Sequence, residues 1–375
     1  MKRVGIVSYN MYGNFTNYGS ALQSYALHRA IDSLDPERIE SVVVDYCPDI
    51  LADKDILNPM ANMWDTDPDA RERCRLTLPA IRVNYGKFLN FYKTNYRLTR
   101  RAYTSANFND SLEDENLDGY VCGSDTVFAV PEFGFDDGFY ASYNVMRHRS
   151  VAYAASFGDY DMPDSDIPEL RKRLANFNAI ALRENEHKAA VEHLVSAPVF
   201  KVIDPTLLLP SEQYETITVE PEQAEPYLLL YSRRGNDSMQ QFAERYAAEN
   251  HLRVIEISLN ARNAEKHTMR YDAGVEEFLG LVKNASIVIT NSFHGMIFAV
   301  QFRRPFYIFS RKLCNNKIEE VLDLFGITDR MLTSGHEPEA APIDYDAVHN
   351  RIGKAREESL RILRDEITTH IPTSI

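Results

Sequence analysis

A histidine and a glycine follow a short apolar run in the second half of the chain, at a spacing that could bind an anion. The run 287–289 is typical of a buried strand, and Ser292 after it is a good helix N-cap. Phe293, His294 and Gly295 then fall in the first turn of a helix. N–H groups there lack intrahelical partners and carry partial positive charge, glycine lets a ligand approach, and histidine can donate a hydrogen bond or a proton. A Ser-capped helix with a half-exposed histidine that binds nothing fits the same residues.

A hydroxyl and a carboxylate follow another expected strand. Ser124 and Asp125 come directly after the strand expected at 118–122. Asp125 could hydrogen-bond a sugar hydroxyl or accept its proton. An N-cap aspartate explains this residue equally well.

Three cations are candidates for binding an anionic ligand. Arg183 stands between an expected strand and a helix, where its guanidinium could clamp a carboxylate or a phosphate. The alternative for Arg183 is a surface ion pair with Glu184 or Glu186. Arg233 and Lys317 also lie near the ends of expected strands, although such side chains are more often solvated.

The polar loop 10–19 follows the first expected strand and includes Asn17, Tyr18 and Gly19. Open α/β sheets bind ligands at the carboxyl ends of their strands, where this loop lies. The loop lacks the GxGxxG pattern of dinucleotide sites, and its amides and hydroxyls suit a sugar or a phosphate equally. A solvated loop is the alternative.

Strands and helices alternate along the chain, which predicts an α/β fold with two Rossmann-like parallel-sheet domains facing a cleft. We assign residues 1–209 to an acceptor-side domain and 210–345 to a donor-side domain, because a Pro-containing stretch separates them. Helices at 50–116 are expected to cover the first domain. A C-terminal helix at 346–375 could pack back on it. Strands are expected at 3–8, 40–46, 118–122, 150–155, 178–182, 199–203, 227–231, 253–258, 287–289 and 304–309.

The composition excludes several classes of protein. The chain has 375 residues, is 44% hydrophobic and carries a net charge of −14. Such a surface repels nucleic acid and anionic lipid unless a local basic patch overrides it. No apolar run is long enough to span a bilayer, so any membrane association would be peripheral. The four scattered cysteines indicate reduced thiols in a cytoplasmic protein, and no metal-ligand spacing is visible.

Six short segments together resemble the polysaccharide pyruvyl transferase family. They occur in the family's order and cover nearly the whole chain, with the middle helices least informative. Phe128 departs from the pattern, because the family usually carries Trp there. The segments are NYGSALQSYAL at 17–27, DGYVCGSD at 118–125, YAASFG at 153–158, ALRENE at 181–186, DPTLLL at 204–209 and TNSFHGMIFAVQFRRPF at 290–306.

The resemblance implies a GT-B-like fold and transfer of the pyruvyl group of phosphoenolpyruvate onto two hydroxyls of a sugar residue as a ketal, in cell-surface polysaccharide biosynthesis. It implies a sugar or lipid-linked oligosaccharide acceptor, a location at the inner face of the membrane, and no metal or other cofactor. By similarity, Arg183 and His294 match positions that hold the donor. His294 could protonate the donor carbon or stabilise phosphate, and both roles stay open. Asp125 could assist the attacking hydroxyl.

Two other functions fit the same architecture. A sugar-nucleotide glycosyltransferase would use the same helix N-terminus for a diphosphate, and an acidic residue in the second domain to hold a ribose would favour it. A catalytically silent binding protein of the same fold is the third. The donor-site hypothesis requires Arg183 and His294 to converge on one site, and it fails if they lie on opposite faces.

Overall fold

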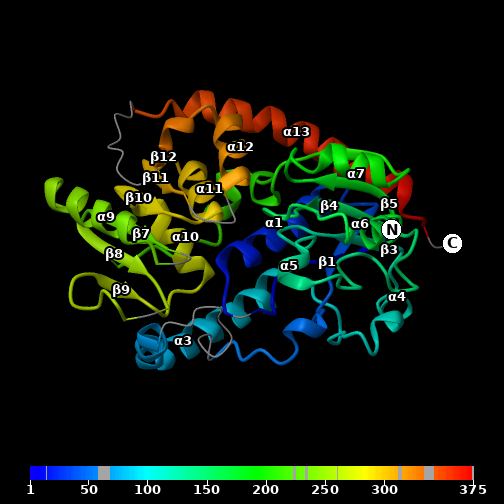
Figure 1. Ribbon diagram of the computed structural model, residues 1–375, viewed down its shortest axis with the longest axis horizontal. Coiled ribbons are helices and arrows are strands. Elements are labelled where there is room, and N and C mark those ends of the chain that lie inside the picture. The colour runs from blue at the N-terminus through cyan, green and yellow to red at the C-terminus, as the bar shows by residue number, and fades with distance from the viewer. Residues whose placement is uncertain are drawn as a thin grey trace.

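Two parallel sheets lie side by side in the computed structural model (Figure 1). The structure describes residues 1–13, 15–57, 68–222, 225–232, 235–259, 261–310, 315–332 and 342–373, with the side chains of all of these except 68–74 and 315–316. Each sheet has six strands and is buried by helices, as an all-parallel sheet requires.

The first sheet has the strand order β2-β1-β3-β4-β5-β6. Val4 of β1 pairs with Ser41 on one side and with Gly119 on the other, so β1 is central. The strand expected at 40–46 ends earlier, at Val43. The strands are β1 Lys2–Val7, β2 Ile39–Val43, β3 Gly119–Cys122, β4 Ser150–Ala155, β5 Phe177–Leu182 and β6 Val199–Lys201.

The second sheet has the order β12-β11-β10-β7-β8-β9. Its two edge strands were not predicted, because β9 (Thr268–Arg270) and β12 (Met331–Leu332) are too short to show an apolar pattern. The four longer strands were predicted. They are β7 Tyr227–Tyr231, β8 Arg253–Ile257, β10 Ile287–Thr290 and β11 Phe306–Phe309.

Most helices connect consecutive strands, as parallel pairing demands. Asn17 caps α1 (Tyr18–Leu34) through its side chain. The others of seven or more residues, apart from the two long helices described next, are α6 Ile167–Leu174, α7 Lys188–Leu194, α9 Asp237–Glu249, α10 Val275–Asn284, α11 Phe293–Gln301 and α12 Asn315–Phe325. Short helices are α4 Ser111–Asp114, α5 Val130–Phe133 and α8 Ser211–Glu215.

Helix α3 (Pro68–Asn95) does more than cover the first domain. Thr77 donates a hydrogen bond to the carbonyl of Leu259, and Lys87 pairs with Glu277 of α10 at 2.7 Å. These partners belong to the second domain. The expectation of a first-domain cover was therefore incomplete, because the helix extends across both domains.

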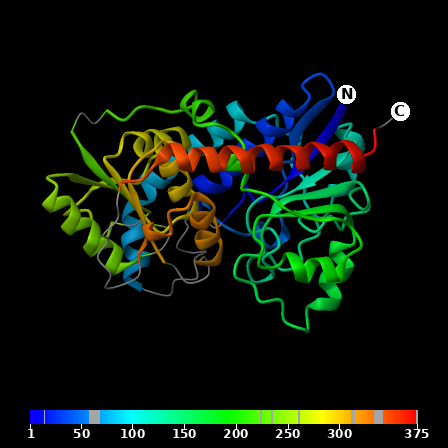
Figure 2. The same cartoon turned by 90° about the horizontal axis from the view of Figure 1, so that it is seen from above.

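The C-terminal helix α13 (Tyr345–His370) packs back on the first domain, as predicted. Figure 2 shows it running along both domains, with its C-terminal end near the N-terminus. Lys2 Nζ donates to the carbonyl of Ile367 at 2.8 Å. His349, at the other end of α13, contacts the carbonyl of Val300 in α11. No helix in the described ranges is long and apolar enough to cross a membrane.

Candidate active site

Arg183 lies at the end of β5 with its side chain only 2% exposed. Its Nε is 2.7 Å from Glu184 Oε1, and its Nη1 is 2.9 Å from Asp204 Oδ2 and 3.5 Å from Asp125 Oδ1. Burial acts to lower the pKa of Arg183, but the three carboxylates outweigh it and hold the pKa above its usual value. The alternative, a surface ion pair of Arg183 with Glu184 or Glu186, is wrong because Arg183 is buried. Glu184 does pair with Arg183, but away from the surface.

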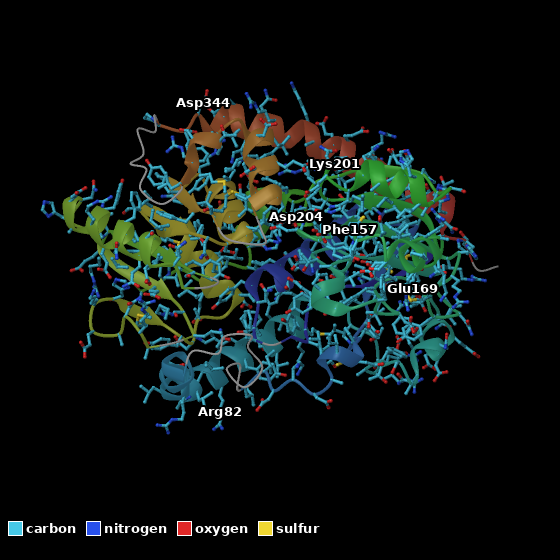
Figure 3. All side chains as sticks on the ribbon, in the orientation of Figure 1. Arg82, Phe157, Glu169, Lys201, Asp204 and Asp344 are labelled. Atoms are coloured by element: carbon cyan, nitrogen blue, oxygen red, sulfur yellow. The ribbon has the colours of Figure 1, made fainter. Side chains whose placement is uncertain are left out.

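Asp204 joins Arg183 to His294, and the sequence analysis did not single it out. Its Oδ1 accepts hydrogen bonds from the backbone and hydroxyl of Thr206, which leaves Oδ2 for Arg183 and His294. Asp204 Oδ2 is 2.9 Å from Arg183 Nη1 and 3.6 Å from His294 Nε2. Figure 3 labels Asp204 near the middle of the molecule, where the two domains meet. The signal available was a carboxylate directly after an expected strand, the same signal that identified Asp125.

Burial alone would raise the pKa of the Asp204 carboxyl. His294 and Arg183 reverse this effect and hold the pKa well below its usual value. Asp204 is therefore ionised over the whole range in which the protein would work.

We expect Asp204→Asn to lower the free energy of unfolding by about 3–5 kcal/mol near neutral pH, because Arg183 would lose its best-placed buried partner. The folded-state pKa of Asp204 is depressed, so its contribution is present above the unfolded pKa of about 3.9 and is lost as the pH falls. The cost of the substitution should shrink accordingly below about pH 4. Urea unfolding of both proteins at several pH values measures this difference.

Asp137→Asn is the matched control, because Asp137 pairs with Arg173 at the surface and is 49% exposed. It should cost less than about 1 kcal/mol at any pH. A pH-independent cost at Asp204 would show that packing, and not the buried ion pairs, explains the loss.

His294 is buried, so the expectation of a half-exposed histidine is wrong. The residue is 8% exposed and lies in the first turn of α11, which Ser292 caps by accepting a hydrogen bond from the N–H of Gly295 at 3.2 Å. The His294 ring also lies against Gly19 in the first turn of α1. A Cβ added at Gly19 would be 2.6 Å from His294 Cγ. Two helix N-termini therefore meet at His294, and both favour negative charge.

Gly19→Ala should lower the free energy of unfolding by about 1–3 kcal/mol, because the new methyl group overlaps the His294 ring. The test is a double-mutant cycle with His294→Ala. The alanine at position 19 should cost much less when the ring is absent. An equal cost in both backgrounds would mean that the two side chains do not interact.

Two cations contact the ring of Phe293. The Arg183 guanidinium carbon is 5.0 Å from the centre of its ring, and Lys317 Nζ is 5.8 Å away. Lys317 is 8% exposed, and within the part of the chain that the structure describes it has no hydrogen bond or ion pair. Lys317 is thus a nearly buried cation that pairs with no carboxylate of the described residues, whereas lysine side chains are more often solvated.

Asp125 lies beside this cluster in a left-handed backbone conformation (φ 71°) and caps no helix. Its Oδ2 accepts a hydrogen bond from Ser20 Oγ at 3.2 Å. Burial acts to raise the pKa of Asp125, but Arg183, His294 and Lys317 together lower it below the usual value. The N-cap interpretation of Asp125 is wrong, because the residue faces the cations of the site.

The remaining predicted site residues differ in where they lie and in what they contact. Asn17 caps α1 through its side chain, and the amide of Ser124 and its hydroxyl are both hydrogen-bonded within the first domain. Tyr18 is buried, donates to the carbonyl of Ala273 at 2.7 Å, and stacks on Phe278 of α10. These contacts give Tyr18 and Ser124 a packing role. Gly295 is closely surrounded and Phe128 is fully buried, while Arg233 lies outside the described residues.

Helix α12 carries Lys317, and Glu320, one turn after Lys317 in this helix, contacts the first domain. Glu320 accepts a hydrogen bond from the N–H of Asn185 at 2.9 Å and pairs with Lys201 at 3.0 Å. Lys201 in turn donates to the carbonyl of Arg183 at 2.7 Å. These contacts fix Lys317 relative to the guanidinium on the opposite domain.

The charges of the cluster nearly cancel. Arg183 and Lys317 supply two positive charges, and Asp125, Asp204 and Glu184 supply three negative ones, which leaves −1 before His294 is counted. A proton on His294 brings the sum to zero. An anionic ligand is therefore favoured when His294 is protonated, with the helix N-termini adding partial positive charge. No three His, Cys, Asp or Glu side chains of the described residues are grouped so as to hold a metal ion.

A comparison with known protein families shows to which family the chain belongs. A family model described as "Polysaccharide pyruvyl transferase" matches residues 17–312. The chain belongs to the polysaccharide pyruvyl transferase family. The match includes Gly19, Asp125, Arg183, Asp204 and His294, whereas Lys317 lies just beyond its end. No curated protein sequence matches the chain significantly.

Solved structures confirm a GT-B-like fold for this pyruvyl transferase family member. The Staphylococcus aureus MnaA–UDP co-structure is 13% identical over 99% of this chain and 91% of that chain, with a TM-score of 0.50. UDP-GlcNAc 2-epimerase from Methanocaldococcus jannaschii is 14% identical over 97% of this chain and 99% of that chain, also with a TM-score of 0.50. At these identities the likeness concerns the fold alone.

Proposed function

We propose that the protein transfers the pyruvyl group of phosphoenolpyruvate onto two hydroxyls of one sugar residue as a ketal, in cell-surface polysaccharide biosynthesis. The observation that carries the proposal is the meeting of Arg183 and His294 at one carboxylate of Asp204, beside Lys317, which has no ion pair with any described residue. The proposal includes a sugar or lipid-linked oligosaccharide acceptor, no cofactor, and a cytoplasmic location at the inner face of the membrane.

The donor is a small trianion, and the cluster offers several groups that suit it. Lys317 supplies a positive charge that forms no ion pair with a described residue, and the first-turn N–H groups of Phe293 and His294 supply hydrogen-bond donors. Arg183 Nη2 is buried and has no hydrogen-bond partner among the described residues, so it can donate one bond to the donor carboxylate or phosphate. Its other nitrogens hold the protein's own carboxylates.

The reaction adds two hydroxyl oxygens to the enol carbon and releases phosphate. A proton is transferred to the terminal methylene and the first sugar hydroxyl adds to the resulting cationic carbon. The proton that this hydroxyl loses replaces the one given to the methylene. The carbon–oxygen bond to phosphate then breaks. The second hydroxyl closes the ketal, and its proton leaves with the phosphate as hydrogen phosphate.

His294 is our candidate for protonating the methylene or for stabilising the phosphate, and the Asp204 carboxylate lies 3.6 Å from its Nε2. Asp125 is a weak base, because its pKa is lowered. We therefore assign Asp125 to stabilising the cationic carbon and receiving a hydrogen bond from the attacking hydroxyl. This role needs a carboxylate that stays ionised.

A sugar-nucleotide glycosyltransferase is the second candidate. The structures with a TM-score of 0.50 include a UDP-GlcNAc 2-epimerase. We therefore include the glycosyltransferase among the outcomes of the test. In the second domain, Glu256 is the buried carboxylate at the end of β8, but its Oε2 already accepts from Asn263 and contacts His267 Nδ1 at 2.6 Å. Glu256 is thus engaged within the protein, and this disfavours it as a ribose ligand.

Calorimetric titration of phosphoenolpyruvate, UDP-sugars and GDP-sugars tests the proposal on the wild type and on Lys317→Met. We expect binding of phosphoenolpyruvate alone, weakened about ten- to hundredfold by the substitution, because one charged contact is lost. Lys172→Met is the control, since Lys172 is exposed on α6. Binding of a nucleotide sugar alone would support the glycosyltransferase. Binding of no donor, with or without a sugar acceptor, would support a silent binding protein.

A further inference from the structure

The segment 73–109 has a charge pattern opposite to that of the whole protein. It contains no aspartate or glutamate, although the chain has 55 acidic residues and a net charge of −14. Most of the segment is helix α3. The cations of the segment are Arg73, Arg75, Arg82, Lys87, Lys93, Arg97, Arg100 and Arg101.

Two cations of α3 are free to meet an external partner. Lys87 is neutralised by Glu277 and Asp272. By contrast, Arg82 and Lys93 are exposed, and neither has an ion pair with any residue that the structure describes. Figure 3 labels Arg82 at the outer edge of the molecule, on the side of α3 away from the sheets.

The same helix exposes large apolar side chains. Leu76 is 63% exposed, Val83 is 51% exposed and Leu89 is 47% exposed, and these are three of the six exposed large hydrophobic residues in the described part of the chain. At 100° per residue they share one side of α3 with Arg82 and Lys93. The opposite side of the helix is buried against the protein.

We propose that the outer face of α3, defined by Leu76, Arg82, Val83, Leu89 and Lys93, docks on a bilayer surface that contains anionic lipid. Cations beside apolar side chains suit the boundary between headgroups and acyl chains, where each type of group finds its partner. A second copy of this face would place like charges opposite each other. A nucleic acid would give the apolar residues no partner.

The inner face of α3 contacts the loop that precedes α1. Thr16 Oγ1 and Asn84 Oδ1 are hydrogen-bonded, and Tyr92 donates to the carbonyl of Asn10 at 3.2 Å. That loop leads directly to Gly19, which lies against His294. Docking through α3 would bring the candidate active site close to the lipid surface. This part of the inference rests on the proposed function, because it supplies a reason for a lipid-linked acceptor.

Vesicle co-sedimentation without donor or acceptor tests the docking separately from the reaction. The full chain should bind phosphatidylcholine vesicles containing phosphatidylglycerol, and it should bind pure phosphatidylcholine much more weakly. The double substitution Arg82→Gln and Lys93→Gln should weaken binding about 30-fold, because each cation near an anionic surface contributes about fivefold. High salt should release the protein.

Two further variants decide between a membrane and a general polyanion site. Lys172→Gln with Arg361→Gln removes two exposed cations from other helices and should leave vesicle binding unchanged. Val83→Gln should weaken vesicle binding severalfold but should not affect binding to soluble polyglutamate. Absence of vesicle binding, equal losses in the two double variants, or equal binding of vesicles and polyglutamate with no effect of Val83→Gln would each overturn the proposal.

Discussion

Replacing Arg183 with methionine is expected to lower the free energy of unfolding by about 3–5 kcal/mol, because the change leaves buried carboxylates without their cation. Asp125, Asp204 and Glu184 all lie within 3.5 Å of the guanidinium. Of the three, Asp204 is the most deeply buried. Urea unfolding at neutral pH measures the loss.

Arg361→Met is the matched control for this prediction. Arg361 also pairs with two carboxylates, but its side chain is 56% exposed, so its removal should change the free energy of unfolding very little. Arg183→Lys should fall between the two, since lysine keeps the charge but not the forked geometry. A cost at Arg183 as small as that at Arg361 would contradict a structural role for the cluster.

Replacing His294 with glutamine should lower the rate of pyruvyl transfer by about 10²–10⁴-fold. Glutamine can still donate a hydrogen bond from a similar position, but it cannot transfer a proton. Steady-state phosphate release with an acceptor sugar measures the effect. We choose glutamine over alanine because His294 is buried against Gly19 and Asp204, so alanine would leave a void.

His193→Gln is the control, because His193 is exposed on α7 and contacts only the carbonyl of Ala189 among the described residues. It should retain full activity. Retention of more than about a tenth of the activity in His294→Gln would assign His294 to hydrogen bonding of the phosphate. Full activity would remove His294 from the mechanism.

Much of the fold could be predicted because parallel strands that are buried on both faces leave continuous apolar runs in the sequence. Runs such as Tyr227–Tyr231 and Ile287–Thr290 carry that signal on their own. The edge strands β9 and β12 lack it, since they are short and half-solvated. Helix α3 was predicted, but its contacts with the second domain depend on tertiary packing that local patterns do not encode.

The position of the candidate site could be predicted for a related reason, since the carboxyl ends of parallel strands meet at one edge of each sheet. Arg183, Asp125 and His294 all follow strands, and the structure brings them together around Asp204. Their burial could not be predicted. Each of these polar side chains resembles a surface residue when it is considered alone, and its burial depends on contacts with residues far away in the sequence.

The placement of α13 has a consequence for the order in which the protein can fold during synthesis. Ile362, Leu363 and Ile367 of this helix are buried and belong to the core that includes Val4 and Val151 of the first sheet. Chains emerge from the ribosome with the N-terminal domain first. In this protein the first sheet is synthesised early, but the helix that packs on it, α13, is synthesised last. The nascent first domain therefore carries an uncovered apolar face throughout translation of the second, and this is the stage at which a chaperone would be most needed.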